Sequence, residues 1–167
     1  MSIDNEELVE EFYQPLFRFA LSLTKAEPDA VDLVQQTFLR WAQKGHQLRE
    51  EKKVKSWLFT TLHREFLGSR RRQTKFPHID MEKAESELPN IASTIVEKLD
   101  AGIVMDALQK VDDKFRSALA LFYLKQHSYK EIASVLDIPI GTVMSRISRG
   151  KSQLREILAN AATATPA

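Results

Sequence analysis

The sequence predicts an all-α protein of two small helical domains, a helical bundle and a helix-turn-helix unit, joined by a linker. Its 167 residues include only 5 Gly and 6 Pro, and Leu, Ala, Glu, Lys and Arg are common, a composition that favours helices. Apolar residues recur at helical spacing through most of the chain. Near the middle, Pro77, Pro89 and several acidic residues interrupt this spacing, which separates two units of about 60 to 70 residues.

The first unit is expected to begin with two helices. Apolar side chains between Leu8 and Leu23 repeat at helical spacing and predict a helix over 5–24. Pro28 is suited to the start of the second helix, and Gly45 ends it.

A polar loop and a third helix are expected to complete the first unit. Residues 46–55 are mostly polar or charged and predict the loop. Ser56 is a suitable N-cap for the third helix, which runs into three consecutive arginines. The apolar side of this helix is expected to carry Trp57, Leu58, Leu62, Phe66 and Leu67.

The second unit is expected to start near Ala101 with a stripe of Val104, Leu108 and Val111. A helix over 114–125 follows, with Phe115, Ala118, Leu119, Phe122 and Tyr123 expected to face inward. The predicted domains are therefore the bundle, 1–72, the linker, 73–100, the helix-turn-helix unit, 101–160, and a tail, 161–167.

The strongest pattern is a short helix, a tight turn and a longer helix. Ser128 can cap the short helix, and Glu131 completes a capping box. Pro139 ends the turn, and Gly141 and Thr142 open the longer helix. Its expected buried stripe is Val143, Ile147, Leu154, Ile157 and Leu158. Its outer face carries Thr142, Ser145, Arg146, Ser148, Arg149, Lys151, Ser152 and Arg155.

This arrangement predicts a DNA-binding helix-turn-helix. Arginine can donate two hydrogen bonds to guanine in the major groove, small hydroxyl side chains allow close approach, and cations at the edges contact phosphates. The alternative is an amphipathic helical hairpin with a basic surface.

The net charge of +1 conceals four blocks of alternating sign. The net charge is −6 over 1–39, +8 over 40–75, −6 over 76–113 and +5 over 114–167. Two basic regions in a nearly neutral chain indicate two contacts with a polyanion. Solvated helix faces are the alternative interpretation.

Several classes of function are disfavoured. No cysteine is present, which excludes thiol chemistry and Cys-ligated metals. The four histidines are scattered, and the sequence has no P-loop or GxSxG motif. We expect no enzymatic activity, no metal and no cofactor. The sequence has no apolar run that is long enough to predict a membrane span, and the acidic N-terminus is unlike a secretory signal. The expected location is therefore the cytoplasm.

Three segments resemble the extracytoplasmic-function sigma factors. Residues 107–158 resemble region 4 of that family, and the segment GTVMSRISRGKSQLREIL is the most specific part. Residues 29–43 resemble the polymerase-binding helix of region 2, and residues 54–72 resemble its promoter-melting helix. The resemblance implies a dissociable subunit of bacterial RNA polymerase that binds core polymerase and promoter DNA.

The resemblance also assigns roles in region 2. The polar face of the docking helix would contact the clamp helices of the largest polymerase subunit, and the polymerase flap is a further expected contact. The residues that match this role are Asp29, Asp32, Leu33, Gln35 and Gln36. The loop after this helix falls where the family holds a flipped base of the minus-ten element. The expected minus-ten contacts are Lys52, Lys53, Arg64, Arg70, Arg71 and Arg72.

For the minus-thirty-five element, the expected contacts are Lys130, Thr142, Ser145, Arg146, Ser148, Arg149 and Lys151. Arg149 and Ser145 are the leading base readers, whereas Arg146, Lys151 and Lys130 are expected on phosphates. Met144 stands where the family often has a basic residue.

Two other functions remain open at this point. One is a regulator that binds duplex DNA alone through its C-terminal unit, and the other is a sequestering adaptor without DNA contacts. Members of the family often pair with an anti-sigma protein, for which the sequence carries no motif. The linker would let the two units either pack together or span the polymerase.

Overall fold

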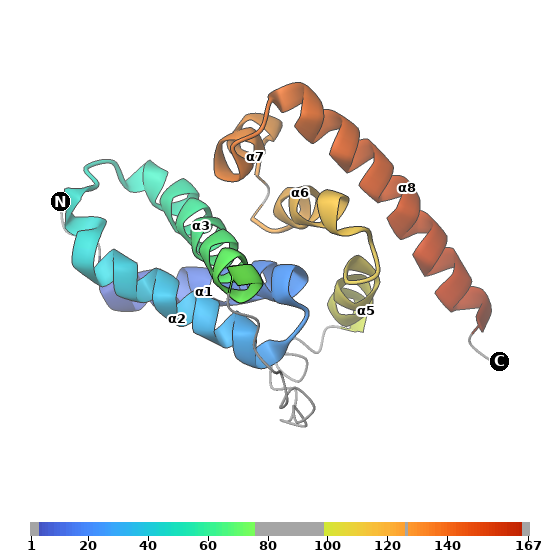
Figure 1. Ribbon diagram of the computed structural model, residues 1–167, viewed down its shortest axis with the longest axis horizontal. Coiled ribbons are helices and arrows are strands. Elements are labelled where there is room, and N and C mark those ends of the chain that lie inside the picture. Colours follow the sequence, from blue (N-terminus) through green and yellow to red (C-terminus); the bar gives the residue numbers. More distant parts are fainter. Residues whose placement is uncertain (1–3, 76–98, 126, 165–167) are drawn as a thin grey trace.

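The computed structural model describes residues 4–75, 99–125 and 127–164 (Figure 1). These residues form helices and contain no strand, which confirms the all-α class. The helices of the first unit are α1 (Asn5–Thr24), α2 (Glu27–Lys44) and α3 (Val54–Lys75), with two short 3-10 helices, η1 (Gly45–Gln47) and η2 (Glu51–Lys53). Those of the second are α5 (Leu99–Leu108), α6 (Asp113–Tyr123), α7 (Tyr129–Leu136) and α8 (Ile140–Ala164).

The first two helices form as their sequences predict. The Asp4 carboxylate accepts a hydrogen bond from the Glu6 amide at 3.0 Å and caps α1. Lys25 adopts a left-handed conformation that ends this helix, and Pro28 lies in the first turn of α2. Gly45 ends α2 with ordinary right-handed geometry. A glycine is needed there because a Cβ atom would lie 2.5 Å from the indole ring of Trp41.

Three local predictions were wrong. Ser56 does not cap α3, because η2 leads directly into a helix that begins at the buried Val54. Part of the expected loop, 46–55, is therefore 3-10 helical. Leu67 and Tyr123 were expected on apolar faces but are 40% and 47% exposed, since each lies on the outward side of its helix.

The helix-turn-helix is confirmed. The Ser128 hydroxyl accepts a hydrogen bond from the Glu131 amide at 3.0 Å, and the Glu131 carboxylate accepts one from the Ser128 amide at 2.8 Å. Asp137 adopts a left-handed conformation between α7 and α8. Gly150 lets α8 approach α6 closely, because a Cβ atom there would lie 3.2 Å from the Leu119 side chain. Val143, Ile147 and Leu154 of the predicted stripe are buried, whereas Ile157 and Leu158 are half-buried.

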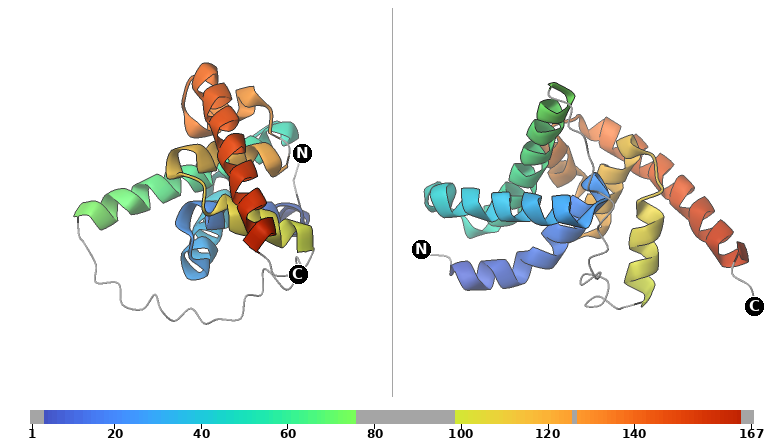
Figure 2. Two further views of the ribbon diagram at one scale, coloured as in Figure 1. Left: turned by 90° about the vertical axis from the view of Figure 1, so that its right-hand side faces the viewer. Right: turned by 60° about the horizontal axis from the view of Figure 1, so that its bottom comes forward.

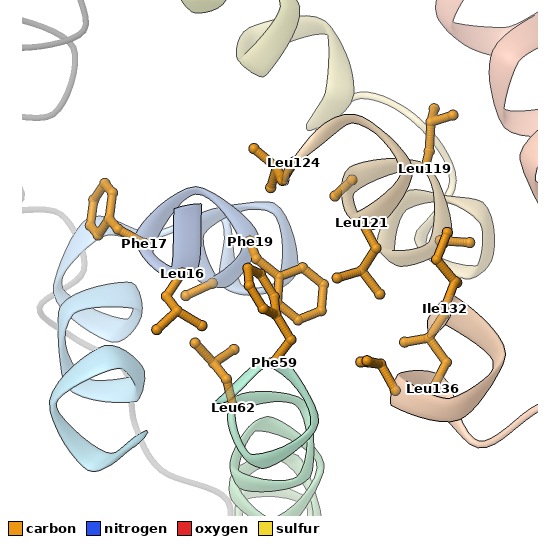
Figure 3. Packing of buried hydrophobic residues seen from close by; sticks show 14 of the residues in the cluster. Leu16, Phe17, Phe19, Phe59, Leu62, Leu119, Leu121, Leu124, Ile132 and Leu136 are labelled. Atoms are coloured by element: carbon orange, nitrogen blue, oxygen red, sulfur yellow. The ribbon is translucent and has the colours of Figure 1, made fainter. Parts of the chain in front are cut away.

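The two units pack against each other. In Figures 1 and 2, α1, α2 and α3 form one group, and α8 lies at the outer edge of the other. Helix α6 contacts α1, and α7 contacts α3. Figure 3 shows Phe19 and Phe59 from the first unit facing Leu121, with Ile132 and Leu136 on the same side. All five side chains belong to one buried cluster, so the units share a hydrophobic core.

The predicted linker, 73–100, is shortened at both ends by helix. Helix α3 continues to Lys75, and α5 begins at Leu99. The remaining part, 76–98, lies outside the described residues.

Candidate nucleic-acid interface

The first candidate surface is the outer face of α8. Ser145, Ser148 and Arg149 are exposed there, on the side of the helix opposite its buried stripe. The Ser145 hydroxyl donates a hydrogen bond to the Thr142 carbonyl at 3.2 Å. Lys130, on α7, is also exposed. The helix-turn-helix therefore presents hydroxyl and cationic groups together, as a major-groove surface requires.

Other predicted residues of this surface lie at its edge. Thr142 and Arg146 are half-buried beside the core stripe. The Lys151 ammonium lies 4.3 Å from the centroid of the Phe122 ring, in a cation–π contact. Lys151 would have to leave that ring to contact a phosphate, whereas Arg149 needs no such rearrangement.

The second candidate surface follows the C-terminal half of α3. Arg64, Arg70, Arg71 and Arg72 are all exposed. Arg64 and Arg71 are seven residues apart and share one side of the helix. The Arg70 guanidinium also lies 5.6 Å from the centroid of the Phe66 ring.

Lys52 and Lys53 do not join these arginines. They lie in η2 at the N-terminal end of α3, and a helical rise of about 1.5 Å per residue puts roughly 27 Å between Lys53 and Arg71. Lys53 pairs with Glu50 at 3.1 Å. The predicted minus-ten set therefore forms two cationic groups, one at the N-terminal end of α3 and one along its C-terminal half.

The predicted polymerase-binding residues lie on α2. Asp29, Asp32, Gln35 and Gln36 are exposed, whereas Leu33 is 7% exposed and packs in the core. All five line a cleft of about 790 Å³, which also includes residues of α3 and α6. The cleft combines acidic and amide groups from α2 with Arg70 and Arg72 from α3. Such a mixed polar surface suits a protein partner with charged side chains.

Arg116 is a functional candidate that the sequence did not reveal. Its side chain is buried where the two units meet, and it also lines the cleft. Its guanidinium donates hydrogen bonds to the carbonyls of Ser22 on α1 and Val111, and it pairs with Asp113 at 2.7 Å. This pairing is the main reason that the pKa of Asp113 is lowered. A lone arginine in an amphipathic helix gives no signal that its charge will be buried.

Two further groups join the units. The Lys55 ammonium, on α3, donates to the Lys125 carbonyl at 3.2 Å and pairs with Glu131 at 3.4 Å. The Lys125 ammonium pairs with Glu11 at 3.4 Å and lies 5.1 Å from the centroid of the Phe12 ring. The same Glu131 carboxylate caps α7, and this hydrogen bond with the Ser128 amide is the main cause of its lowered pKa.

Two histidines, His63 and His127, have lowered pKa values. Burial, followed by the charge of Arg64, lowers the pKa of His63 to about 4. Burial is also the main cause of the lowered pKa of His127. Within the described ranges, no three His, Cys, Asp or Glu side chains gather as metal ligands would. No helix in the described part of the chain is both long and apolar enough to cross a membrane.

Comparison with known proteins identifies both units. The Sigma-70 region 2 profile matches residues 8–76, and the Sigma-70, region 4 profile matches residues 101–154. The chain is 29% identical over 158 residues to the ECF RNA polymerase sigma factor SigM of Bacillus subtilis, an alignment that spans 94% of this chain and 95% of SigM. It is 30% identical over 151 residues to the ECF RNA polymerase sigma factor SigL of Mycobacterium tuberculosis, which covers 89% and 85% of the two chains.

The fold agrees with this relationship. The sigma factor RpoE of Bartonella quintana, solved in complex with the anti-sigma factor NepR, matches with a TM-score of 0.65 and 26% identity. The match covers 92% of this chain and 98% of that one. The two profiles occur in the order that the sequence predicts, and the alignments with SigM and SigL span 95% and 85% of those chains. The chain therefore belongs to the extracytoplasmic-function (ECF) family of RNA polymerase sigma factors.

Proposed function

We propose that this chain binds core RNA polymerase, directs it to specific promoters and helps to separate the DNA strands there. The observation that carries the proposal is the presence of two cationic surfaces on two helical units, one of them a helix-turn-helix, in a chain of the ECF family. The polymerase would carry out the chemistry, so the chain is not itself an enzyme. It would act in the cytoplasm, together with the polymerase and the chromosome.

The helix-turn-helix would bind the minus-thirty-five element as duplex DNA. Arg149 and Ser145 are exposed on the outer face of α8 and would contact base edges, with Ser148 between them. Thr142 and Arg146 lie at the edge of this face, where phosphates would pass. Lys130 would contact a phosphate from α7, and Lys151 would do so after leaving Phe122.

The bundle would bind the minus-ten element. Unstacking a base costs a few kcal/mol, so cationic contacts along the separated strand have to offset this cost. Arg64 and Arg71 lie on one side of α3, with Arg70 and Arg72 beside them, and could follow such a strand. Lys52 and Lys53, at the N-terminal end of α3, would contact the same DNA strand near the flipped base.

The polar face of α2 would bind the polymerase. Asp29, Asp32, Gln35 and Gln36 are exposed and suit the clamp helices of the largest subunit, whereas Leu33 would support this face from the core. The second unit would contact the polymerase flap.

An anti-sigma protein is a further proposed partner, which the likeness to RpoE in its complex with NepR supports. A protein other than polymerase that co-purifies with the tagged chain should then block its transcription activity.

The packed arrangement of the two units would be the state of the chain away from the polymerase. Lys55, two residues from the predicted minus-ten lysine Lys53, is bound to Glu131 of the helix-turn-helix. The two DNA-binding units could then reach separate promoter elements only after this contact breaks.

Reconstitution tests the proposal. Labelled chain should bind core polymerase and direct transcription from promoters of its own genome, while binding free promoter DNA only weakly. The alternative function, a regulator that binds DNA alone, predicts tight operator binding without polymerase. Good core binding without transcription would instead support a sequestering adaptor. A triple substitution, Arg64→Ala, Arg71→Ala and Arg149→Ala, should retain core binding and lose transcription.

A further inference from the structure

Two large apolar side chains project from the start of the recognition helix. Ile140 is 49% exposed and Met144 is 52% exposed, in the first two turns of α8. They are four residues apart and therefore neighbours on the helix surface. Neither belongs to the buried cluster, which α8 joins through residues such as Val143 and Ile147. Packing of the fold therefore does not explain why these two exposed positions are apolar.

Gly141, between them, is also unexplained by the fold. A Cβ atom at this position would meet no atom within 4 Å, and its backbone is not left-handed. Alanine would therefore fit, and it would favour the helix more than glycine does. A glycine at such a position is useful where a ligand approaches the backbone closely. The start of α8 thus combines an open backbone position with two protruding apolar groups.

The surroundings of this pair favour DNA over a protein partner. Ser145 is exposed next to Met144, Arg149 is exposed five residues further along α8, and Lys130 is exposed on α7 of the same helix-turn-helix. Charged residues are depleted at the centres of protein interfaces, whereas they are typical of DNA-binding surfaces. In the major groove, thymine alone presents an apolar group, its C5-methyl, and apolar side chains are its usual contacts.

We propose that Ile140 and Met144 read thymine methyl groups in the minus-thirty-five element. Arg149 would supply the hydrogen bonds to a base, and the apolar pair would add a preference for thymine at one or two neighbouring positions. Gly141 would allow the helix to come close enough for these contacts. This assignment rests on the proposed function, because it requires α8 to lie in the major groove of a promoter.

Deoxyuridine provides a direct test, because it pairs as thymine does and lacks only the methyl group. Promoter templates would carry deoxyuridine at one minus-thirty-five thymine at a time, on either strand. Holoenzyme reconstituted with the wild-type chain should lose about fourfold in open-complex formation at a contacted position, the loss expected for one methyl group. Met144→Ala or Ile140→Ala should lower activity on the thymine template and remove the sensitivity to deoxyuridine at its own position.

Ile103→Ala is the matched control, since Ile103 is 51% exposed on α5, away from this surface. This variant should respond to deoxyuridine as the wild-type chain does. The proposal is overturned if active wild-type holoenzyme forms open complexes equally well on every deoxyuridine template. It is also overturned if the Ile140→Ala and Met144→Ala variants both keep the full sensitivity to deoxyuridine. An equal loss on all templates would also overturn it, because that result indicates a protein contact. Absence of transcription from any promoter would refute the proposed function instead.

Discussion

The imidazole of His127 meets the ring of Phe59 edge to face, with ring centroids 4.6 Å apart and ring planes at 77°. Phe59 lies on α3 and His127 precedes α7, so this contact joins the two units. The His127 Nδ1 lies 2.9 Å and 3.0 Å from the carbonyl oxygens of Leu124 and Leu121, which makes it the protonated nitrogen. Its Nε2 is buried without a hydrogen-bond partner in the described part of the chain.

The buried guanidinium of Arg116 should hold the two units together. Arg116→Ala removes its ion pair and leaves the Ser22 and Val111 carbonyls without this donor, so the free energy of unfolding should fall by about 2–4 kcal/mol. Urea unfolding measures this change, and small-angle scattering should show a larger radius of gyration for the variant. Lys110→Ala, at an exposed position nearby, should change neither quantity. Equal stability of the Arg116 variant and the wild-type chain would contradict the role of this residue.

Two glycines should respond to alanine in opposite ways. Gly45→Ala places a Cβ atom 2.5 Å from the Trp41 ring, and this ring cannot move freely because its Nε1 donates to Asn5 at 3.1 Å. The substitution should destabilise the protein by about 1–3 kcal/mol. Gly141→Ala meets no neighbour and should stabilise it by roughly 0.5–1 kcal/mol. Thermal and urea unfolding of both variants give the comparison, and a stabilising Gly45→Ala would refute the packing argument.

Stability should depend on pH through His63. Its pKa is about 4 in the folded protein and about 6.5 in an unfolded chain. The unfolded chain therefore binds more protons between these values, and the free energy of unfolding falls as the pH is lowered through 6.5. Between pH 7.5 and 5.5 this residue should account for a loss of about 1 kcal/mol. His63→Phe should remove that part of the loss in urea unfolding, and an unchanged pH dependence would contradict the assignment.

Base readout and phosphate contact predict different effects on promoter choice. Arg149→Ala should cost about 1–3 kcal/mol on the preferred promoter and relax one position of the minus-thirty-five element. Lys130→Ala should weaken all promoters alike and reduce the logarithmic salt dependence by about 1. Transcription from a set of promoters with single base changes, measured at several salt concentrations, separates the two effects. A uniform loss with Arg149→Ala would assign it to a phosphate.

Much of the fold could be predicted from local sequence patterns. Ser128, Glu131 and Pro139 act through neighbours a few residues away, so the helix-turn-helix was recognisable before the structure was known. The start of α3 was misplaced because the burial of Val54 depends on distant residues. The exposed Tyr123 lies next to a turn, where helical periodicity determines the inward side poorly.

The contacts between the two units could not be predicted in this way. Arg116 donates a hydrogen bond to the carbonyl of Ser22, which lies 94 residues earlier in the sequence. No local pattern marks either residue as a partner. For the DNA surfaces, residue type and helical register correctly indicated that Ser145, Ser148 and Arg149 are exposed. The contact of Lys151 with Phe122 depends on the packing of α6 against α8, and only the structure reveals it.

The central claim is that the chain gives core polymerase specificity through two separate DNA-binding units. Genome-wide mapping of transcription starts with the reconstituted holoenzyme tests it most directly. The starts should share an upstream and a downstream sequence element at a fixed spacing, and Arg149→Ala should alter only the upstream one. Starts that share no pair of elements, or an equal set of starts from core polymerase alone, would contradict the claim.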